Sequence, residues 1–171
     1  MIWTSCSESW LKPQPLSFFA PENVFIDESG FEALLISMRR DLRGDSHYSE
    51  SGKLPNEQMS SDMGVVGPLN TAFCRDFITQ LTPAGDGGRN NYSRLFDDAY
   101  SAIKTTNLLI SRIDNLSWTD ETKRNSILAE GYFFRSYWYY RLIHSFGDVP
   151  WTGTEITNAK LDFYTYSRDA I

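Results

Sequence analysis

Side chains that could carry out acid–base, nucleophilic or metal chemistry are few and widely spaced in this sequence. Asp97 and Asp98 are adjacent carboxylates, but neighbouring residues of a helix point in different directions, so both are expected to be solvated. His47 and His144 lie far apart, and His144 is expected at a helix C-terminus, where it suits the dipole. The sequence also lacks GxSxG, HExxH and phosphate-loop motifs. These patterns predict that the protein is not an enzyme.

The two cysteines, Cys6 and Cys74, are far apart and sit in dissimilar contexts. A metal site typically needs a CxxC motif or a Cys/His cluster, and the sequence has neither. We therefore expect no metal and no other cofactor. A disulfide between the two cysteines remains open, although Cys74 in TAFCRDF is typical of a small buried hydrophobic residue.

Length and charge limit the class of protein. The 171 residues suffice for one ordinary domain with a buried core. The net charge of -6 disfavours a nucleic-acid or anionic-membrane partner, because phosphate binding normally requires clustered Lys and Arg. No window approaches the ~18–20 consecutive apolar residues that span a bilayer. The sequence therefore favours a soluble protein or the soluble part of an anchored one.

The N-terminal part of the chain predicts an extended segment followed by one amphipathic helix. Residues 1–27 contain three prolines and no helical period, which favours an extended conformation. From about Ser29 to Arg43 the apolar residues recur at helical spacing. Ser29 and Glu32 have the spacing of a capping box, and Gly44 is the expected left-handed stop.

Residues 44–91 show no sustained period and are rich in Gly, Ser, Asn and Pro. One short helix is predicted within them, over TAFCRDFITQL. Long irregular segments inside compact domains are usually either functional or disordered. The scattered apolar and aromatic residues argue against plain disorder, so we expect long irregular loops here.

Two long helices are predicted between Tyr92 and Phe146. The apolar residues expected near one face of the first helix are Phe96, Ala99, Ile103, Ile110 and Ile113. In the link NLSWT, Thr119 or Ser117 is the expected N-cap of the second helix, with Asp120 in its first turn. Because two long helices with a short link must pack antiparallel, residues 92–146 are predicted to form a helical hairpin.

The second of these helices carries an aromatic run, in AEGYFFRSYWYYRLIHSFGDVPW from Ala129 to Trp151. Ile127, Phe134, Trp138 and Leu142 share one side with Gly131, and Leu128, Tyr132, Tyr139 and Ile143 form a neighbouring stripe. These rings are predicted to be mainly core. Gly147 is the expected C′ residue, and Pro150 prevents the helix from continuing.

The end of the chain resembles the beginning of another element. Ser167 and the following Arg-Asp-Ala-Ile have the pattern of a cap and the first turn of a helix. A single turn is not stable by itself, and the aromatic helix needs more cover than its hairpin partner gives. We therefore expect the chain to be a fragment of a longer protein, with an exposed apolar surface that favours aggregation.

The aromatic run and its turn resemble the signature of the SusD/RagB family of outer-membrane nutrient-binding lipoproteins. The fitting residues are Ala129, Glu130, Phe133, Arg135, Tyr137, Tyr139, Tyr140, Leu142, Phe146, Gly147, Asp148, Val149 and Pro150, whereas Gly131 and Ser136 depart from the pattern. The preceding helix is similar as well, with Tyr100, Ile103 and Asn107 at the expected spacing, as are SSDMGVVG and YSRDAI. The resemblance covers nearly the whole chain, but only about the first third of a family member.

This resemblance implies an all-α, SusD-like scaffold of tetratricopeptide-type helix pairs with long irregular loops. Residues 1–27 would form an extended lipoprotein tether, and residues 28–171 the N-terminal part of an incomplete helical domain. WTSCSESWL resembles a lipoprotein box in which Cys6 is the acylated residue, and Thr4 and Ser5 suit it whereas Trp3 does not. The signal peptide that would precede this box is expected to be truncated.

The resemblance also implies a function at the cell surface. Family members bind a glycan, or a peptide in RagB-like members, and lie against a SusC-type TonB-dependent transporter in the outer membrane. A glycan site needs flat rings and short polar groups, and the irregular region offers Tyr48, Asp62, Asn70, Phe73, Arg75, Phe77, Arg89, Asn90, Asn91 and Tyr92. Trp118 is expected to be exposed outside that loop face. The alternative is a helical protein–protein interaction module without a ligand of its own.

Overall fold

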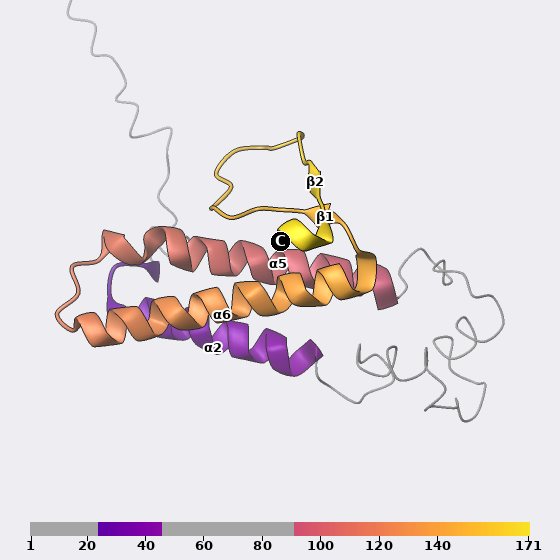
Figure 1. The fold of residues 1–171 in the computed structure, drawn as a ribbon. Coiled ribbons are helices and arrows are strands. Elements are labelled where there is room, and N and C mark those ends of the chain that lie inside the picture. Colours follow the sequence, from indigo (N-terminus) through magenta and orange to yellow (C-terminus); the bar gives the residue numbers. More distant parts are fainter. Residues whose placement is uncertain (1–23, 46–90) are drawn as a thin grey trace, which may run out of the picture.

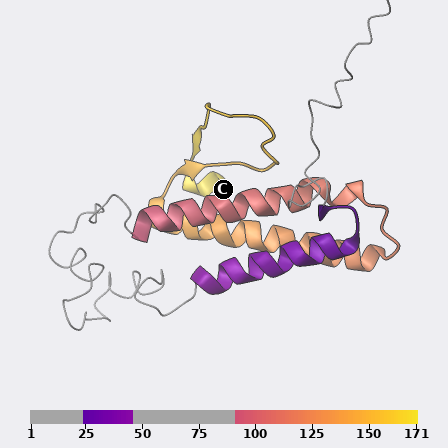
Figure 2. The same ribbon diagram turned by 180° about the vertical axis from the view of Figure 1, so that it is seen from behind.

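The computed structural model describes residues 24–45 and 91–171. Its elements are helices α2 (Glu28–Asp45), α5 (Asn91–Arg112) and α6 (Glu121–Phe146), the 3-10 turns η2 (Ile113–Asn115) and η3 (Arg168–Ala170), and strands β1 (Val149–Pro150) and β2 (Thr165–Tyr166). Each of the three helices contacts the other two, and the short hairpin of β1 and β2 lies on the side of the helices away from α2 (Figures 1 and 2). The predicted all-α class is confirmed.

Helix α2 begins one residue before the predicted start. Asp27 Oδ1 accepts hydrogen bonds from the backbone N–H of Gly30 at 3.1 Å and from Ser29 Oγ at 2.7 Å. The Ser29 bond, with help from Gly30, lowers the pKa of the Asp27 carboxyl. The predicted capping box of Ser29 and Glu32 is therefore wrong: an aspartate caps a helix equally well, and Asp27 directly precedes the first residue of α2, whereas Ser29 already lies inside the helix.

The predicted stop at Gly44 is also wrong, because α2 continues to Asp45. A glycine permits the left-handed conformation but does not impose it. Among the described glycines, only Gly147 has a positive φ, of 73°. A glycine stop was predicted at the end of α2, at Gly44, and at the end of α6, at Gly147. Only Gly147 adopts the left-handed conformation.

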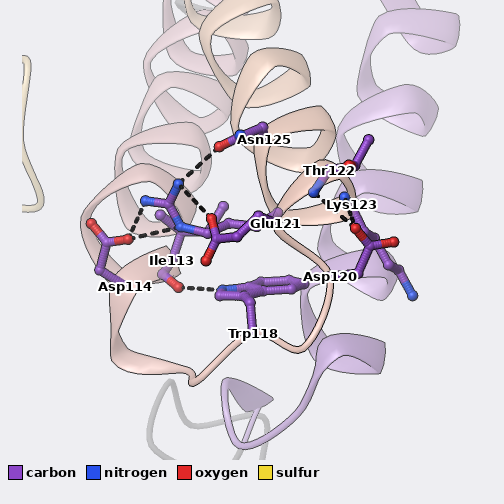
Figure 3. A network of polar contacts seen from close by, with 9 residues as sticks. Ile113, Asp114, Trp118, Asp120, Glu121, Thr122, Lys123 and Asn125 are labelled. Carbon is purple, nitrogen blue, oxygen red and sulfur yellow. Dashed lines mark hydrogen bonds and ion pairs between the residues drawn. The ribbon is translucent and has the colours of Figure 1, made fainter.

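The hairpin of α5 and α6 forms as predicted, but its link is organised differently (Figure 3). Asp120, not Thr119 or Ser117, is the N-cap of α6. Its Oδ1 accepts from the backbone N–H of Thr122 at 2.8 Å and of Lys123 at 3.2 Å. A carboxylate at this position also interacts favourably with the positive end of the helix dipole, which favours it over a hydroxyl.

Trp118 in the same link is half-buried, so its predicted exposure is wrong. Its indole Nε1 donates to the carbonyl oxygen of Ile113 at 2.7 Å, as Figure 3 shows. Its ring lies 5.3 Å from the ring of Phe31 in α2, centroid to centroid. The link thus serves as one end of the core, where all three helices meet.

Ion pairs between α2 and α6 show how the two helices run relative to each other. Lys123, near the start of α6, lies 2.8 Å from Glu28 and 2.7 Å from Glu32 at the start of α2. Further along both helices, Arg39 forms an ion pair of 2.7 Å with Glu130. Helices α2 and α6 are therefore parallel, and α5 runs antiparallel to both.

The core consists of two clusters along the helices. The first joins α2 to the hairpin and contains Phe25, Phe31, Leu35, Met38, Leu109, Ile113, Ile127 and Phe134. The second joins α5, α6 and β1 and contains Leu95, Ala99, Ala102, Ile103, Trp138, Tyr139, Leu142 and Val149. The predicted stripe of α5 is correct at Ala99, Ile103 and Ile113, but Leu95 is buried where Phe96 was expected.

The aromatic helix α6 buries the stripe predicted for its inner side. Ile127, Gly131, Phe134, Trp138 and Leu142 are all buried. Gly131 permits a close approach of α5, since a Cβ there would lie 2.9 Å from Leu109 Cδ2. The neighbouring stripe is only partly covered: Tyr139 is buried, Leu128 and Ile143 are half-buried and Tyr132 is exposed. Beside it, Phe133 and Tyr140 are exposed as well. The rings of this helix therefore divide between core and surface.

Candidate functional site

The residues predicted to contact ligand lie almost entirely outside the part of the chain that the structure describes. This holds for Tyr48, Asp62, Asn70, Phe73, Arg75, Phe77, Arg89 and Asn90, and for the proposed lipidation site Cys6. Asn91 and Tyr92 form the first residues of α5, where the backbone alone is described. These assignments stay predictions.

The described residues contain a different feature, the segment that returns from the end of α6 along α5. Gly147 ends the helix with φ 73°, and its N–H donates to Ile143 O at 3.1 Å. Three residues later, the hydroxyl of Tyr100 in α5 donates to Pro150 O at 2.7 Å. Burial raises the pKa of the Tyr100 hydroxyl, with the neighbouring Tyr139 as a second cause, so it remains a donor at neutral pH.

Asn107 and Arg135 hold the next part of this segment from the two helices of the hairpin. Asn107 Nδ2 donates to Thr152 O at 2.7 Å. Arg135 Nη1 donates to Asn107 Oδ1 at 3.1 Å and to Gly153 O at 2.8 Å. Two backbone carbonyls of the segment are thus satisfied by side chains, which replaces the hydrogen bonds that a regular element would supply.

Trp151 packs where these contacts converge. Its ring centroid lies 4.4 Å from that of Tyr139, and the Arg135 guanidinium lies 5.6 Å from it. The same guanidinium lies 5.1 Å from the ring of Tyr132. The Tyr139 hydroxyl accepts from the N–H of Thr152 at 2.7 Å. Trp151 therefore contributes to anchoring the segment, although it is still 37% exposed.

The return segment is also held by an ion pair. Together with the contacts of Tyr100, Asn107, Arg135 and Tyr139, this ion pair forms the first anchor of the segment. Arg112 Nη2 of α5 lies 2.8 Å from Glu155 Oε1, and Arg112 Nε donates to Glu155 Oε2 at 3.0 Å. The hydrogen bonds from Arg112 lower the pKa of the Glu155 carboxyl, against a smaller opposing effect of burial. Such a two-point contact fixes the orientation of both side chains.

A second anchor lies beyond residues 156–164, which form a loop after Glu155. In the β1–β2 hairpin, Val149 pairs with Tyr166 and Pro150 with Thr165. The backbone N–H of Arg168 donates to Asp148 Oδ1 at 2.9 Å. The predicted helix start at Ser167 is a single 3-10 turn, η3, in which Ala170 N donates to Ser167 O at 2.9 Å.

Residues 156–164 span the distance between the two anchors and extend away from α5 (Figures 1 and 2). The large apolar side chains exposed here and in β2 are Ile156, Leu161, Phe163, Tyr164 and Tyr166. The Nζ of Lys160 lies 5.7 Å from the ring centroid of Phe163. This loop was not predicted as a candidate site, although the aromatic cluster in DFYTY, set in a polar stretch, is a usable signal.

A further group of exposed side chains lies on the outer face of α6. Phe133, Tyr140 and His144 are exposed there, and the rings of Tyr140 and His144 are 4.3 Å apart. His144 is in the last turn of the helix, as predicted. Asp97 and Asp98 are both exposed on α5.

The described residues were also compared with what a metal site and a membrane-spanning helix require. Within residues 24–45 and 91–171, no three His, Cys, Asp or Glu side chains are grouped so that they could hold a metal ion. None of the helices in these ranges combines the length and hydropathy that crossing a bilayer requires. The arrangement offers aromatic side chains for non-covalent contacts, on an anchored loop and on one face of α6.

Comparison with known proteins gives one family and two relatives. A family model named SusD-like, and described as starch-binding associating with outer membrane, matches residues 28–170. SusD-like protein P2 of Formosa agariphila is 27% identical over 154 residues, which cover 90% of this chain and 29% of that protein. SusD-like protein P25 of the same organism is 24% identical over 153 residues, covering 85% and 28%.

The chain therefore spans a little under a third of the length of the curated relatives it matches. No solved structure matches it at a significant level.

Proposed function

The chain belongs to the SusD-like family, and from that membership we propose that it is part of a surface lipoprotein that binds a glycan and delivers it to a SusC-type TonB-dependent transporter. The observation that carries this proposal is the match over residues 28–170, which includes helices α2, α5 and α6 and the return segment. The family description, starch-binding associating with outer membrane, supports both the ligand class and the location.

The division of rings in the fold supports a binding role for the loops. Phe134, Trp138 and Tyr139 of α6 are buried and stabilise the helical scaffold. A rigid scaffold that presents ring-bearing loops is a common arrangement for binding sites. The residues predicted between positions 48 and 92 remain candidates for ligand contact, and the loop over residues 156–164 has the same composition of rings and short polar groups.

A binding protein of this kind is not expected to cleave its ligand. The full-length protein incubated with soluble starch should therefore release no reducing sugar. Sustained release, at a rate proportional to protein concentration, would assign an enzymatic activity and overturn this part of the proposal.

We place the lipid anchor at Cys6, as the family resemblance implies. Expressed behind a lipoprotein signal peptide, the full-length protein should incorporate labelled palmitate and fractionate with the outer membrane. Cys6→Ser should abolish the label and release the protein from the membrane. Equal labelling of the variant would place the anchor elsewhere.

The exposed outer face of α6 favours a second candidate, a helical interaction module without a glycan ligand. Phe133 and Tyr140 are both exposed on that face, and exposed rings on a helix are suited to docking another protein. A RagB-like, peptide-binding member is a separate alternative, in which a peptide takes the place of the glycan.

Binding of the full-length protein to an immobilised array of polysaccharides, with soluble starch among them, separates these functions. The proposal expects specific, saturable retention on at least one polysaccharide, and co-purification with a TonB-dependent transporter. If the protein binds members of a peptide library but no polysaccharide, the RagB-like alternative is favoured. Co-purification with the transporter in the absence of any ligand would favour the interaction module.

A further inference from the structure

The loop over residues 156–164 is held at both ends while its middle projects into solvent. At one end Glu155 is fixed by Arg112 of α5, at 2.8 Å. At the other end β2 pairs with β1, and Asp148 accepts from the N–H of Arg168 at 2.9 Å. Both anchors rest on the packed helices. Fixing the ends lowers the conformational entropy that the loop loses when it binds a ligand.

Three rings follow one another closely at the second anchor. Phe163, Tyr164 and Tyr166 are 50%, 70% and 47% exposed, although aromatic side chains favour burial. Such rings combine an apolar face with, in tyrosine, a hydroxyl that donates and accepts hydrogen bonds. Rings exposed at a fixed position are therefore suited to a partner that is flat on one side and polar around its edge.

Charged and amide side chains alternate with these apolar groups. Asn158, Lys160 and Asp162 are all exposed, and the charges of Lys160 and Asp162 offset each other. Burying these groups under a dry protein surface would cost desolvation without providing partners. Sugar hydroxyls, in contrast, can donate to Asp162 and Asn158 and accept from Lys160.

From this juxtaposition we propose that the loop over residues 156–164 contacts a neutral glycan, with Phe163 and Tyr164 stacking on sugar rings. The proposal rests on the glycan-binding function above and adds a place of contact to it. Asn158, Lys160 and Asp162 bind hydroxyls beside the rings. Leu161 at the exposed side of the loop widens the apolar surface.

The test compares two matched ring pairs in the full-length protein, by isothermal titration with soluble starch or with the polysaccharide retained on the array. Phe163→Ala with Tyr164→Ala removes the loop pair. Phe133→Ala with Tyr140→Ala removes a pair of similar exposure, 58% and 53%, on the outer face of α6. The loop variant should bind about tenfold more weakly, which corresponds to losing two ring contacts of ordinary strength. The α6 variant should bind as the wild type does.

A ring-conserving variant, Tyr164→Trp, should keep wild-type affinity, because stacking needs a flat ring and not a particular one. Thermal melting accompanies each titration, and the loop variant should melt at the wild-type temperature. If the wild type binds a polysaccharide and the loop variant binds it with the same affinity, the inference is overturned and the proposed function stays intact. A lowered melting temperature with unchanged affinity would show that another part of the protein covers these rings. A wild type that binds no polysaccharide overturns the proposed function itself.

Discussion

The side chain of Asn107 joins helix α5 to the chain that leaves helix α6 at Thr152. Its Nδ2 donates to the Thr152 carbonyl at 2.7 Å, while its Oδ1 accepts from Arg135 at 3.1 Å. Asn107 is only 2% exposed, so both bonds are shielded from water. Because α5, α6 and the return segment meet at this amide, its geometry determines where the loop beyond Glu155 is presented.

Replacing Asn107 by Leu should destabilise the protein by about 2 kcal/mol, since the Thr152 carbonyl loses the shorter of its two hydrogen bonds, keeping the one from the Tyr139 hydroxyl at 3.2 Å, and Arg135 loses an acceptor. Thermal or urea unfolding measures the effect. Lys104→Ala, at an exposed position on the same helix, is the control and should stay within about 0.5 kcal/mol of the wild type. Equal stability of the two variants would contradict the anchoring role.

The ion pair of Arg112 and Glu155 predicts a pH dependence. The folded state lowers the pKa of Glu155 below its ordinary value of 4.5. The pair therefore stabilises the fold fully above that pH, and its contribution is lost as pH falls through the lower, folded-state pKa. Glu155→Gln should cost about 1 kcal/mol at neutral pH and progressively less on acidification.

Glu130→Gln provides the control for this pH series. Its partner Arg39 has a side chain that is 56% exposed, against 21% for Arg112. Solvent screens the more exposed pair more strongly, so its loss should be smaller. A Glu155→Gln effect that does not change with pH would show that charge is not the source of the stabilisation.

The first turn of α2 predicts a contrast between two glycines of the same helix. A Cβ at Gly30 would lie 1.7 Å from the carbonyl oxygen of Val24, whereas a Cβ at Gly44 would meet nothing within 4 Å. Gly30→Ala should therefore displace the chain before α2 and destabilise the protein by about 1–3 kcal/mol. Gly44→Ala should be neutral or stabilise by up to about 1 kcal/mol, through helix propensity. The reverse order in urea unfolding would contradict the described path of residues 24–27.

The link between α5 and α6 predicts separable roles for the ring and the indole N–H of Trp118. Trp118→Phe keeps a ring near Phe31 and loses the bond to the Ile113 carbonyl, so we expect a loss of about 1 kcal/mol. Trp118→Ala loses the packing as well and should cost about 3 kcal/mol or more. Chemical unfolding that gives the two variants equal stability would exclude a contribution from the ring.

The helical scaffold follows from the sequence because its signals are local and periodic. Ile127, Phe134, Trp138 and Leu142 repeat at helical spacing and are buried together. Gly147 and Pro150 end α6 by backbone geometry that does not depend on the rest of the fold. The same reasoning identified the short link that makes the hairpin antiparallel.

The caps were less predictable because several residues of suitable type lie side by side. Asp27 and Asp120 cap α2 and α6, whereas the sequence favoured Ser29 and Thr119 or Ser117. A shift of one to three residues leaves the hydrophobic pattern almost unchanged, and so the pattern could not select among them.

The return segment was not predicted in detail because its contacts join residues that are distant in sequence. Tyr100 reaches Pro150, and Arg112 reaches Glu155, across 50 and 43 positions. No local period encodes such contacts. Asn107 and Arg135, which both match the family pattern, are among the residues that make the anchor, so at these two positions the pattern has a physical meaning in this chain.

Isothermal titration of the full-length protein with soluble starch, and with any polysaccharide retained on the array, tests the central claim most directly. We predict saturable binding that persists in the Glu130→Gln control. The absence of binding heat with every polysaccharide, from a protein that melts cooperatively and still co-purifies with a transporter, would contradict a glycan-binding function.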